Sequence, residues 1–158
     1  MDVAKYEGEL TRNHWDLLLE ADPWFEAVLA YTPPQLPTAE IFTIGKAKDP
    51  YAICVVIPIE GGPIKGGFEI KNIATKTIMR RQGMAGALID HVVELARARG
   101  AAFVEIGTAS VGYDQIRLYE KHGFEKDGIL RDFFLRYPEP IIENGLLVRD
   151  MVMLRLNL

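Results

Sequence analysis

The segment Arg80-Arg81-Gln82-Gly83-Met84-Ala85-Gly86 lies between a predicted strand, Phe68 to Thr75, and the clearest predicted helix, Met84 to Arg99. The first turn of a helix leaves backbone N–H groups unpaired and carries a partial positive charge, so it attracts anions. The two glycines of the segment let the backbone approach a bulky anion closely, and its two arginines add positive charge. The segment therefore predicts a phosphate-binding loop at the start of a helix.

The segment does not match the sequence patterns of two other phosphate-binding loops. The chain contains neither the Gly-x4-Gly-Lys-Ser/Thr pattern of nucleotide-binding loops nor the Gly-x-Gly-x-x-Gly pattern of dinucleotide folds. Lys71 and Lys76 lie nearby in the sequence, so we expect a local basic cluster in an otherwise acidic chain. A glycine pair at a helix start also fits close helix packing, and the segment alone does not separate the two interpretations.

The rest of the chain predicts a mixed sheet flanked by helices. Tyr51 to Ile59 is almost entirely apolar and rich in β-branched residues, which indicates a strand buried on both faces. The helix from Met84 carries one apolar stripe and ends at Gly100. The other predicted elements are helices around Trp15 to Leu19, over Asp22 to Ala30 and over Tyr113 to His122; strands over Ala39 to Lys46, Ala101 to Thr108, Phe124 to Leu135 and Leu146 to Leu156; and turns at Asp49-Pro50, Gly61 to Pro63, Tyr137 to Pro140 and Glu143 to Gly145.

Composition narrows the class of protein. The 158 residues fit one domain, 1–158, and carry a formal charge of -4 from 18 basic and 22 acidic side chains. A general nucleic-acid binder is expected to be basic, whereas mild acidity suits a cationic substrate. The single cysteine, Cys54, lies in an apolar run and predicts a buried structural thiol. No apolar run approaches a membrane span and no residues show metal-ligand spacing, so we expect a cytoplasmic protein without a metal, nucleic-acid or membrane partner.

Two motifs together resemble the GNAT superfamily of acetyltransferases. Arg80-x-x-Gly83-x-Ala85 is similar to its Gln/Arg-x-x-Gly-x-Gly/Ala signature, and Leu118-Tyr119-Glu120-Lys121-His122-Gly123-Phe124 is similar to its Leu-Tyr-Glu-Lys-x-Gly-Phe segment. The resemblance covers Gly66 to Leu135 well and the N-terminal third poorly. It implies an α/β fold with a mixed, mostly antiparallel twisted sheet of six or seven strands and about four helices. Arg131 to Asp150 further resembles small bacterial members of unassigned substrate.

The resemblance also implies how acetyl-CoA binds. Backbone N–H groups of the phosphate loop hold the pyrophosphate, and the end of the strand before it pairs with the pantetheine arm. The family often places an asparagine where this chain has Gly112, so Ser110 or Asp114 is expected to replace its contact. The expected cofactor-binding residues are Ile73, Ala74, Thr75, Arg80, Arg81, Gln82, Gly83, Met84, Ala85, Gly86, Ala87, Ser110 and Tyr119.

The implied chemistry needs a proton donor and a proton acceptor. By its place in the second motif, Tyr119 is the predicted donor to the CoA thiolate, although the same residue fits a core aromatic beside Phe124. Glu69 is the first candidate base, because histone-type members place a glutamate eleven residues before the loop; a solvent-facing pair with Lys71 is the alternative. Asp150 is the second candidate base, since it interrupts an apolar row of side chains in a predicted strand. Water chains replace a dedicated base in many relatives.

The sequence thus predicts an N-acetyltransferase that uses acetyl-CoA and an amine of a small molecule or a protein. A non-catalytic acyl-CoA binding or sensing module is the alternative, and the missing asparagine at Gly112 favours it. An aminoglycoside or polyamine acceptor is compatible with the net negative charge of the chain. The apolar C-terminal strand is compatible with a homodimer, a common assembly in the family.

Overall fold

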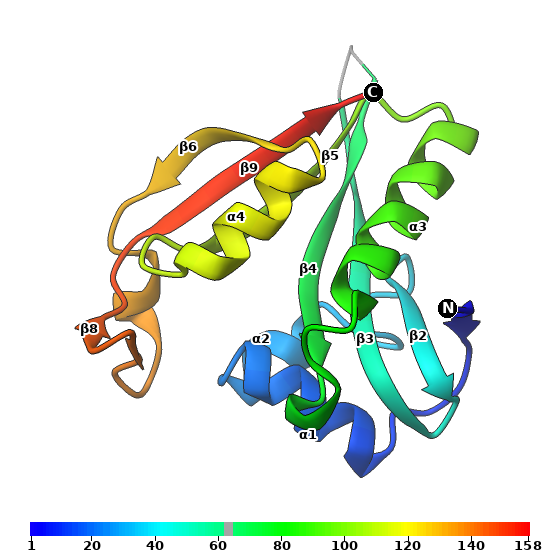
Figure 1. Cartoon of the computed structure of the whole chain (residues 1–158), viewed down its shortest axis with the longest axis horizontal. Helices are drawn as coiled ribbons and strands as arrows, with labels where there is room; N and C mark the ends of the chain where they lie inside the picture. The colour runs from blue at the N-terminus through cyan, green and yellow to red at the C-terminus, as the bar shows by residue number, and fades with distance from the viewer. Residues whose placement is uncertain (62–64) are drawn as a thin grey trace.

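The structure, a computed structural model, describes residues 1–61 and 65–158 (Figure 1). Within these residues one seven-stranded sheet has the order β1-β2-β3-β4-β5-β9-β6, and all neighbours are antiparallel except β4 and β5. A separate hairpin, β7 and β8, follows in the C-terminal loop. The strands are β1 Val3–Tyr6, β2 Glu40–Lys46, β3 Asp49–Ile59, β4 Gly67–Thr75, β5 Phe103–Ala109, β6 Glu125–Leu130, β7 Ile142–Glu143, β8 Leu146–Leu147 and β9 Met151–Asn157.

Helices cover both faces of the sheet, as the sequence predicts. The α-helices are α1 Arg12–Ala21, α2 Phe25–Ala30, α3 Met84–Ala98 and α4 Tyr113–Lys121, with 3-10 turns η1 Thr77–Met79 and η2 Phe133–Arg136. The expected mixed, mostly antiparallel sheet with four flanking helices is confirmed for the described residues. No helix in the part of the chain that the structure describes is long and apolar enough to cross a bilayer.

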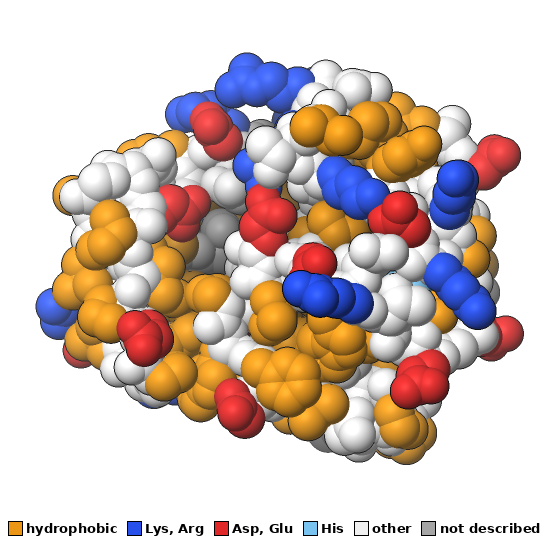
Figure 2. Space-filling view, turned by 90° about the horizontal axis from the view of Figure 1, so that it is seen from below, with side chains coloured by type: hydrophobic (Ala, Val, Ile, Leu, Met, Phe, Trp, Pro, Cys, Tyr) orange, Lys and Arg blue, Asp and Glu red, His pale blue; other side chains and the backbone are white. Residues whose placement is uncertain are grey.

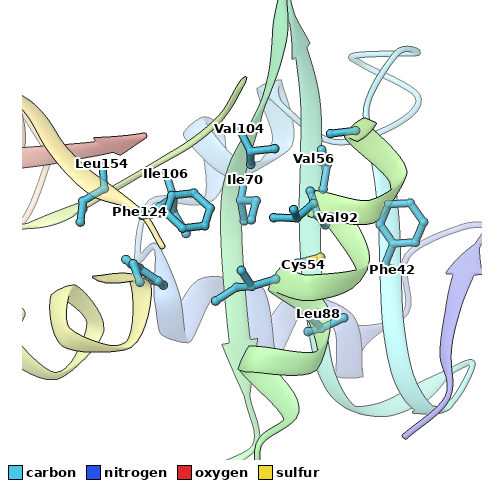
Figure 3. Close-up of a cluster of buried hydrophobic side chains, with 14 of the residues drawn as sticks. Phe42, Cys54, Val56, Ile70, Leu88, Val92, Val104, Ile106, Phe124 and Leu154 are labelled. Atoms are coloured by element: carbon cyan, nitrogen blue, oxygen red, sulfur yellow. The ribbon is translucent and has the colours of Figure 1, made fainter. Parts of the chain in front are cut away.

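The core forms because β3 alternates between two apolar layers. Cys54 and Val56 face α3, where Leu88 and Val92 pack on them (Figure 3). Ile53 and Val55 face α1 and α2 on the other side, together with Leu17, Leu18 and Val28. The prediction of a strand buried on both faces is therefore confirmed. Complete burial raises the pKa of the Cys54 thiol to about 12, which fits the predicted structural role.

The parallel pair β4 and β5 separates part-way along its length. The two strands pair from Phe68–Val104 to Ile70–Ile106, after which β4 continues to Thr75 paired with β3 alone. At this point β4 contains a β-bulge, because Val56 pairs with Ile70 and Val55 with Asn72, which leaves Lys71 as the extra residue. A bulge bends its strand and strengthens the local twist. The backbones of the two strands consequently diverge (Figure 1), and the region between the diverging backbones is termed the wedge.

Two predicted strands in the C-terminal third are too long. The predicted strand Phe124 to Leu135 is wrong beyond Leu130, where β6 ends; Asp132 is left-handed at φ 58°, and its N–H binds the Asp150 carboxylate at 2.7 Å. The predicted strand Leu146 to Leu156 is also wrong at its start. Its first two residues form β8, and β9 begins only at Met151. Asp150 therefore precedes the strand and does not interrupt a buried row.

Three smaller differences lie in the N-terminal half. The short strand β1 was not predicted, since only four residues pair with β2 and no periodic pattern can develop over them. Asp49-Pro50 was expected as a turn but begins β3, while the turn lies at Ala47 and Lys48. The turn predicted at Gly61 to Pro63 falls largely on residues 62–64, outside the described residues.

An ion pair between Glu40 and Arg99 links β2 to the end of α3. The Glu40 side chain is 13% exposed; it accepts a bond of 2.8 Å from Arg99 Nη2, and Lys5 Nζ of β1 lies 3.2 Å away. The Arg99 hydrogen bonds hold the pKa of Glu40 below its ordinary value of 4.5. A carboxylate whose pKa is lower in the folded than in the unfolded protein stabilises the fold at pH values above its unfolded pKa. This contribution to the free energy of unfolding is lost as the pH falls through the folded pKa.

Glu40→Gln should therefore lower the free energy of unfolding by about 1–2 kcal/mol at pH 7. The difference from wild type should shrink between pH 7 and pH 3, because the wild-type carboxyl becomes increasingly protonated as the pH falls. Urea unfolding at both pH values measures it. Glu94→Gln is the control, because its pair with Arg97 is exposed and 3.7 Å long and contributes little. Equal destabilisation by both changes would contradict the role given to Glu40.

Candidate active site

The loop before α3 offers unpaired backbone N–H groups. Arg81 and Gly83 adopt left-handed conformations at φ 62° and φ 82°, and Gly83 caps the helix without a side-chain bond. The first helical bond runs from the Ala87 N–H to the Gly83 carbonyl at 3.0 Å. Among the described residues no acceptor pairs with the N–H groups of Met84, Ala85 or Gly86, the first three of α3. The predicted phosphate loop thus has the free donors that an anion needs.

The predicted basic cluster around this loop is not formed as expected. Lys71 pairs with Glu69 at 3.6 Å, and Lys76 pairs with Asp49 at 2.6 Å. Arg80 is also engaged, at 2.5 Å from a carboxylate oxygen of Glu20 in α1 and through Nε to the Thr75 carbonyl at 3.3 Å. Arg81 makes no ion pair with any described residue. Backbone groups with one free arginine, rather than a cluster of four cations, therefore make up the positive end of the site.

Gly86 has a second reason to be glycine. A Cβ there would lie 2.9 Å from Nε2 of His122, whose Nδ1 is 2.8 Å from the Asp90 carboxylate. The His122 ring thus packs directly on the first turn of α3 and joins it to the end of α4. Gly86 therefore leaves room for the histidine ring, and its N–H remains one of the three unpaired N–H groups at the start of α3.

The wedge exposes one edge of β4. Ile73, Ala74 and Thr75 pair with Cys54, Ile53 and Ala52 of β3, but have no partner on the β5 side among the described residues. An extended group that enters the wedge can therefore bond to this edge as an added strand would. The edge runs towards the phosphate loop, because the chain passes from Thr75 through η1 into the segment before α3.

Tyr119 packs in the core of the protein. The residue is 4% exposed and its ring lies 6.5 Å from that of Phe124, so the expected packing role is present. Its hydroxyl makes no hydrogen bond with any described residue, which leaves it available to a ligand. Burial raises the pKa of the phenol well above its ordinary value, and the Glu143 carboxylate raises it further. Tyr119 is therefore protonated at neutral pH and can donate its hydroxyl proton in a hydrogen bond.

Gly112, which stands where the family often has asparagine, is closely surrounded. A Cβ there would lie 3.1 Å from Gln115 Oε1 and 3.2 Å from Thr108 Oγ1. These two polar atoms occupy the neighbourhood of the missing amide, and sequence spacing gave no sign of them. Asp114, one expected substitute, is 79% exposed and pairs with Arg117; Ser110, the other, donates its N–H to the Asp150 carbonyl at 2.9 Å.

A polar network joins the bulge of β4 to the N-terminal helices and the C-terminal loop. Asn72, 5% exposed, donates to the Leu18 carbonyl and to the Tyr31 hydroxyl, both at 2.9 Å. Tyr31 donates to Asp22 at 2.9 Å, and Tyr137 donates to the other carboxylate oxygen of Asp22 at 2.7 Å. The segments α1–α2 and η2 are thereby held together beside the wedge. Figure 2 shows a recess in the face of the molecule seen from below, with acidic side chains on its edges.

The two candidate bases have different surroundings. Glu69 faces Glu105 across the β4–β5 pair, and its carboxylate also has Lys71 at 3.6 Å. Burial raises the pKa of Glu69, and Glu105 adds to the rise while Lys71 opposes it. Asp150 is half-buried, and its Oδ1 accepts the Asp132 N–H. No group of three or more potential metal ligands occurs in residues 1–61 and 65–158.

The comparisons agree with this geometry. The family model of the acetyltransferase (GNAT) domain matches residues 39–126. The chain is 37% identical over 153 residues to an uncharacterized N-acetyltransferase, YvbK, of Bacillus subtilis, covering 96% of this chain and 94% of that protein. The chain therefore belongs to the GNAT acetyltransferase family, and the predicted membership is confirmed.

Two solved structures with a similar fold contain acetyl-CoA or CoA. A GNAT family acetyltransferase from Elizabethkingia anophelis with acetyl-CoA bound has a TM-score of 0.86 and 31% identity, covering 99% of this chain and 97% of that one. A Bacillus subtilis acetyltransferase in complex with CoA has a TM-score of 0.85 and 35% identity, with the same coverages. The free N–H groups and open β4 edge described above fit a phosphate-bearing, extended cosubstrate, so the predicted acetyl-CoA binding is supported.

Gly83→Glu tests the phosphate loop. The added carboxylate would face the anion at the positive helix end, so acetyl-CoA affinity measured by calorimetry should fall by at least about 100-fold. Gly100→Glu is a matched control: Gly100 is also exposed and left-handed, at φ 72°, but lies at the opposite end of the same helix. Similar acetyl-CoA affinities for the two variants would contradict the loop assignment.

Proposed function

We propose that this chain is a cytoplasmic enzyme that transfers the acetyl group of acetyl-CoA to a primary amine. The observation that supports the proposal is the Tyr119 hydroxyl, which makes no hydrogen bond with any described residue, together with the open edge of β4. A module that only binds acyl-CoA needs the phosphate loop and the open strand edge, but it has no need of an unpaired, protonated phenol. The recess in Figure 2, with acidic side chains on its edges, is the proposed acceptor site.

Each part of the chain has a distinct task in this proposal. The N–H groups at the start of α3 bind the pyrophosphate, and the edge Ile73 to Thr75 aligns the pantetheine arm. A backbone N–H on that edge polarises the thioester carbonyl. Acetyl-CoA supplies the activated acetyl group. Tyr119 stabilises the departing sulfur by hydrogen bonding and passes it a proton, which the phenol regains from the amine nitrogen or from water.

The amine must lose a proton before it attacks, because a primary amine with a pKa near ~10 is mostly protonated at pH 7. Glu69 and Asp150 remain the two bases predicted from the sequence. The raised pKa of Glu69 supports such a role, while Lys71 and Glu105 act on it in opposite directions. Asp150 already accepts a backbone bond. Single Gln and Asn replacements of these residues measure their shares of kcat.

Thiol release from acetyl-CoA tests the proposed function directly. Purified protein is mixed with acetyl-CoA and, in turn, spermidine, kanamycin, lysine and a peptide with a free N-terminal alanine. CoA release with at least one amine, together with the acetylated product in the mass spectrum, is the expected result. Tight acetyl-CoA binding without release in the presence of any amine would favour the binding or sensing module.

Tyr119→Phe should lower kcat by roughly 100-fold, because a positioned proton donor contributes about that much. The ring stays in the core, so the melting temperature and the affinity for acetyl-CoA should be unchanged. Tyr113→Phe is the matched control, since Tyr113 lies on the same helix and is 47% exposed. A kcat of Tyr119→Phe equal to that of wild type would remove the phenol from the mechanism.

A further inference from the structure

The two longer C-terminal helices follow the two strands that diverge. Helix α3 follows β4 and α4 follows β5, and both pack on the same face of the sheet (Figure 1). The phosphate loop precedes α3, whereas Tyr119 lies in α4. Because β4 and β5 pair only as far as Ile70–Ile106, strand pairing does not fix the separation of the two helices beyond that point. The position of the phenol relative to the loop therefore depends on contacts between the helices themselves.

Helix α3 is held on the sheet by more apolar side chains than α4. Its buried residues are Met84, Gly86, Leu88, Ile89, Val92, Val93 and Ala96. Helix α4 buries Ile116 and Tyr119. The free energy that holds a helix on a sheet grows with the apolar area removed from water. If the contact between the helices is lost, α4 is therefore the helix that shifts, and it carries the predicted proton donor.

His122 joins the end of α4 to α3. The residue is the C-cap of α4, and its N–H donates to the Tyr119 carbonyl at 3.0 Å. Its Nδ1 lies 2.8 Å from Oδ1 of Asp90 in the second turn of α3. An ionised carboxylate only accepts, so Nδ1 carries the proton and donates it. In the part of the chain that the structure describes, this is the only side-chain hydrogen bond between α3 and α4 with its cap.

The His122 ring also packs on the first turn of α3. Its side chain is 18% exposed, and a Cβ on Gly86 would lie 2.9 Å from Nε2 and 3.1 Å from Cε1. A larger residue at position 86 would therefore displace the ring. The Asp90 side chain is 68% exposed, and an exposed pair of this kind contributes little to stability. We therefore expect the bond to act on the position of α4 rather than on the stability of the fold.

We propose that His122 is a positioning residue for acetyl transfer: held by Asp90 and packed on Gly86, it fixes α4 against α3 and sets where the Tyr119 hydroxyl lies relative to the phosphate loop. This inference rests on the proposed function, in which His122 itself touches no reacting group. A proton donor acts over a separation of about 3 Å, so a small shift of α4 removes much of its effect on the rate. The bond between the helices converts the position of the bound cosubstrate into a fixed distance to the phenol.

Asp90→Ala removes the bond without opening the core, since Asp90 is exposed. The kcat for thiol release with the most reactive amine of the panel should fall by about 10-fold. Acetyl-CoA affinity measured by calorimetry should not change, because the N–H groups of α3 stay in place. Asp90→Asn should recover most of the rate, since its amide oxygen still accepts from Nδ1. His91→Gln is the matched control: His91 is the next residue of α3, but its ring packs on Phe42 at 4.9 Å.

Gly86→Ala breaks the same contact from the other side. The added methyl group should displace the His122 ring and lower kcat about as much as Asp90→Ala does. Adding His122→Ala to Gly86→Ala should cause no further loss, because the two changes remove one shared contact. If Gly86 serves only the approach of the anion, Gly86→Ala would instead weaken acetyl-CoA binding and leave kcat unchanged, which would contradict the packing role.

Amide hydrogen exchange reports the position of α4 independently of activity. Exchange over Tyr113–Lys121 should be faster in Asp90→Ala, while exchange over Met84–Ala98 stays as in wild type. Wild-type kcat in both Asp90→Ala and His122→Ala would overturn the inference alone, as would a loss of rate that Asp90→Asn does not recover. Failure of the wild-type enzyme to release thiol with every amine of the panel would overturn the proposed function, and the inference with it.

Discussion

The separation of β4 from β5 is the constraint on which the rest of the site depends. Three residue pairs hold the strands parallel up to Ile70–Ile106, and the bulge at Lys71 then bends β4 away. If the pairing continued to Thr75, the backbone groups of the β4 end would be satisfied within the sheet and no ligand could use them. Because of the bulge, the end of β4 does not pair with β5, and its backbone groups are available to a ligand. This free edge runs towards the unpaired N–H groups at the start of α3.

The same bulge is tied to the proposed acceptor side. Asn72, the first residue after it, is tied through Tyr31 to Asp22, and Asp22 also receives the hydroxyl of Tyr137 from the far end of the chain. Segments separated by more than a hundred residues therefore meet beside the wedge. The proposed cosubstrate side is built from backbone groups, which suits a ligand common to a whole family. The proposed acceptor side includes side chains at helix ends and in loops, where specificity can vary.

The sequence predicted those parts of the site that depend on local spacing. Gly83 and Tyr119 stand in short motifs whose helix starts and ends can be inferred from neighbouring residues, and the structure places Gly83 at the start of α3 and Tyr119 within α4. The bulge at Lys71 and the bond from Tyr137 to Asp22 could not be predicted, because each depends on a contact between separate segments of the chain. The misplaced strand after Leu130 has the same origin: the Asp150 carboxylate, eighteen residues away, holds Asp132 in a left-handed conformation.

The most direct test of the account is amide hydrogen exchange with and without acetyl-CoA, followed segment by segment. The account predicts that added acetyl-CoA slows exchange in two places: the β4 edge from Ile73 to Thr75 and the loop from Arg81 to Gly86. Both now carry N–H groups with no partner on the wedge side. Protection elsewhere, with these two segments unchanged, would show that the wedge does not bind the cosubstrate and would contradict the central claim.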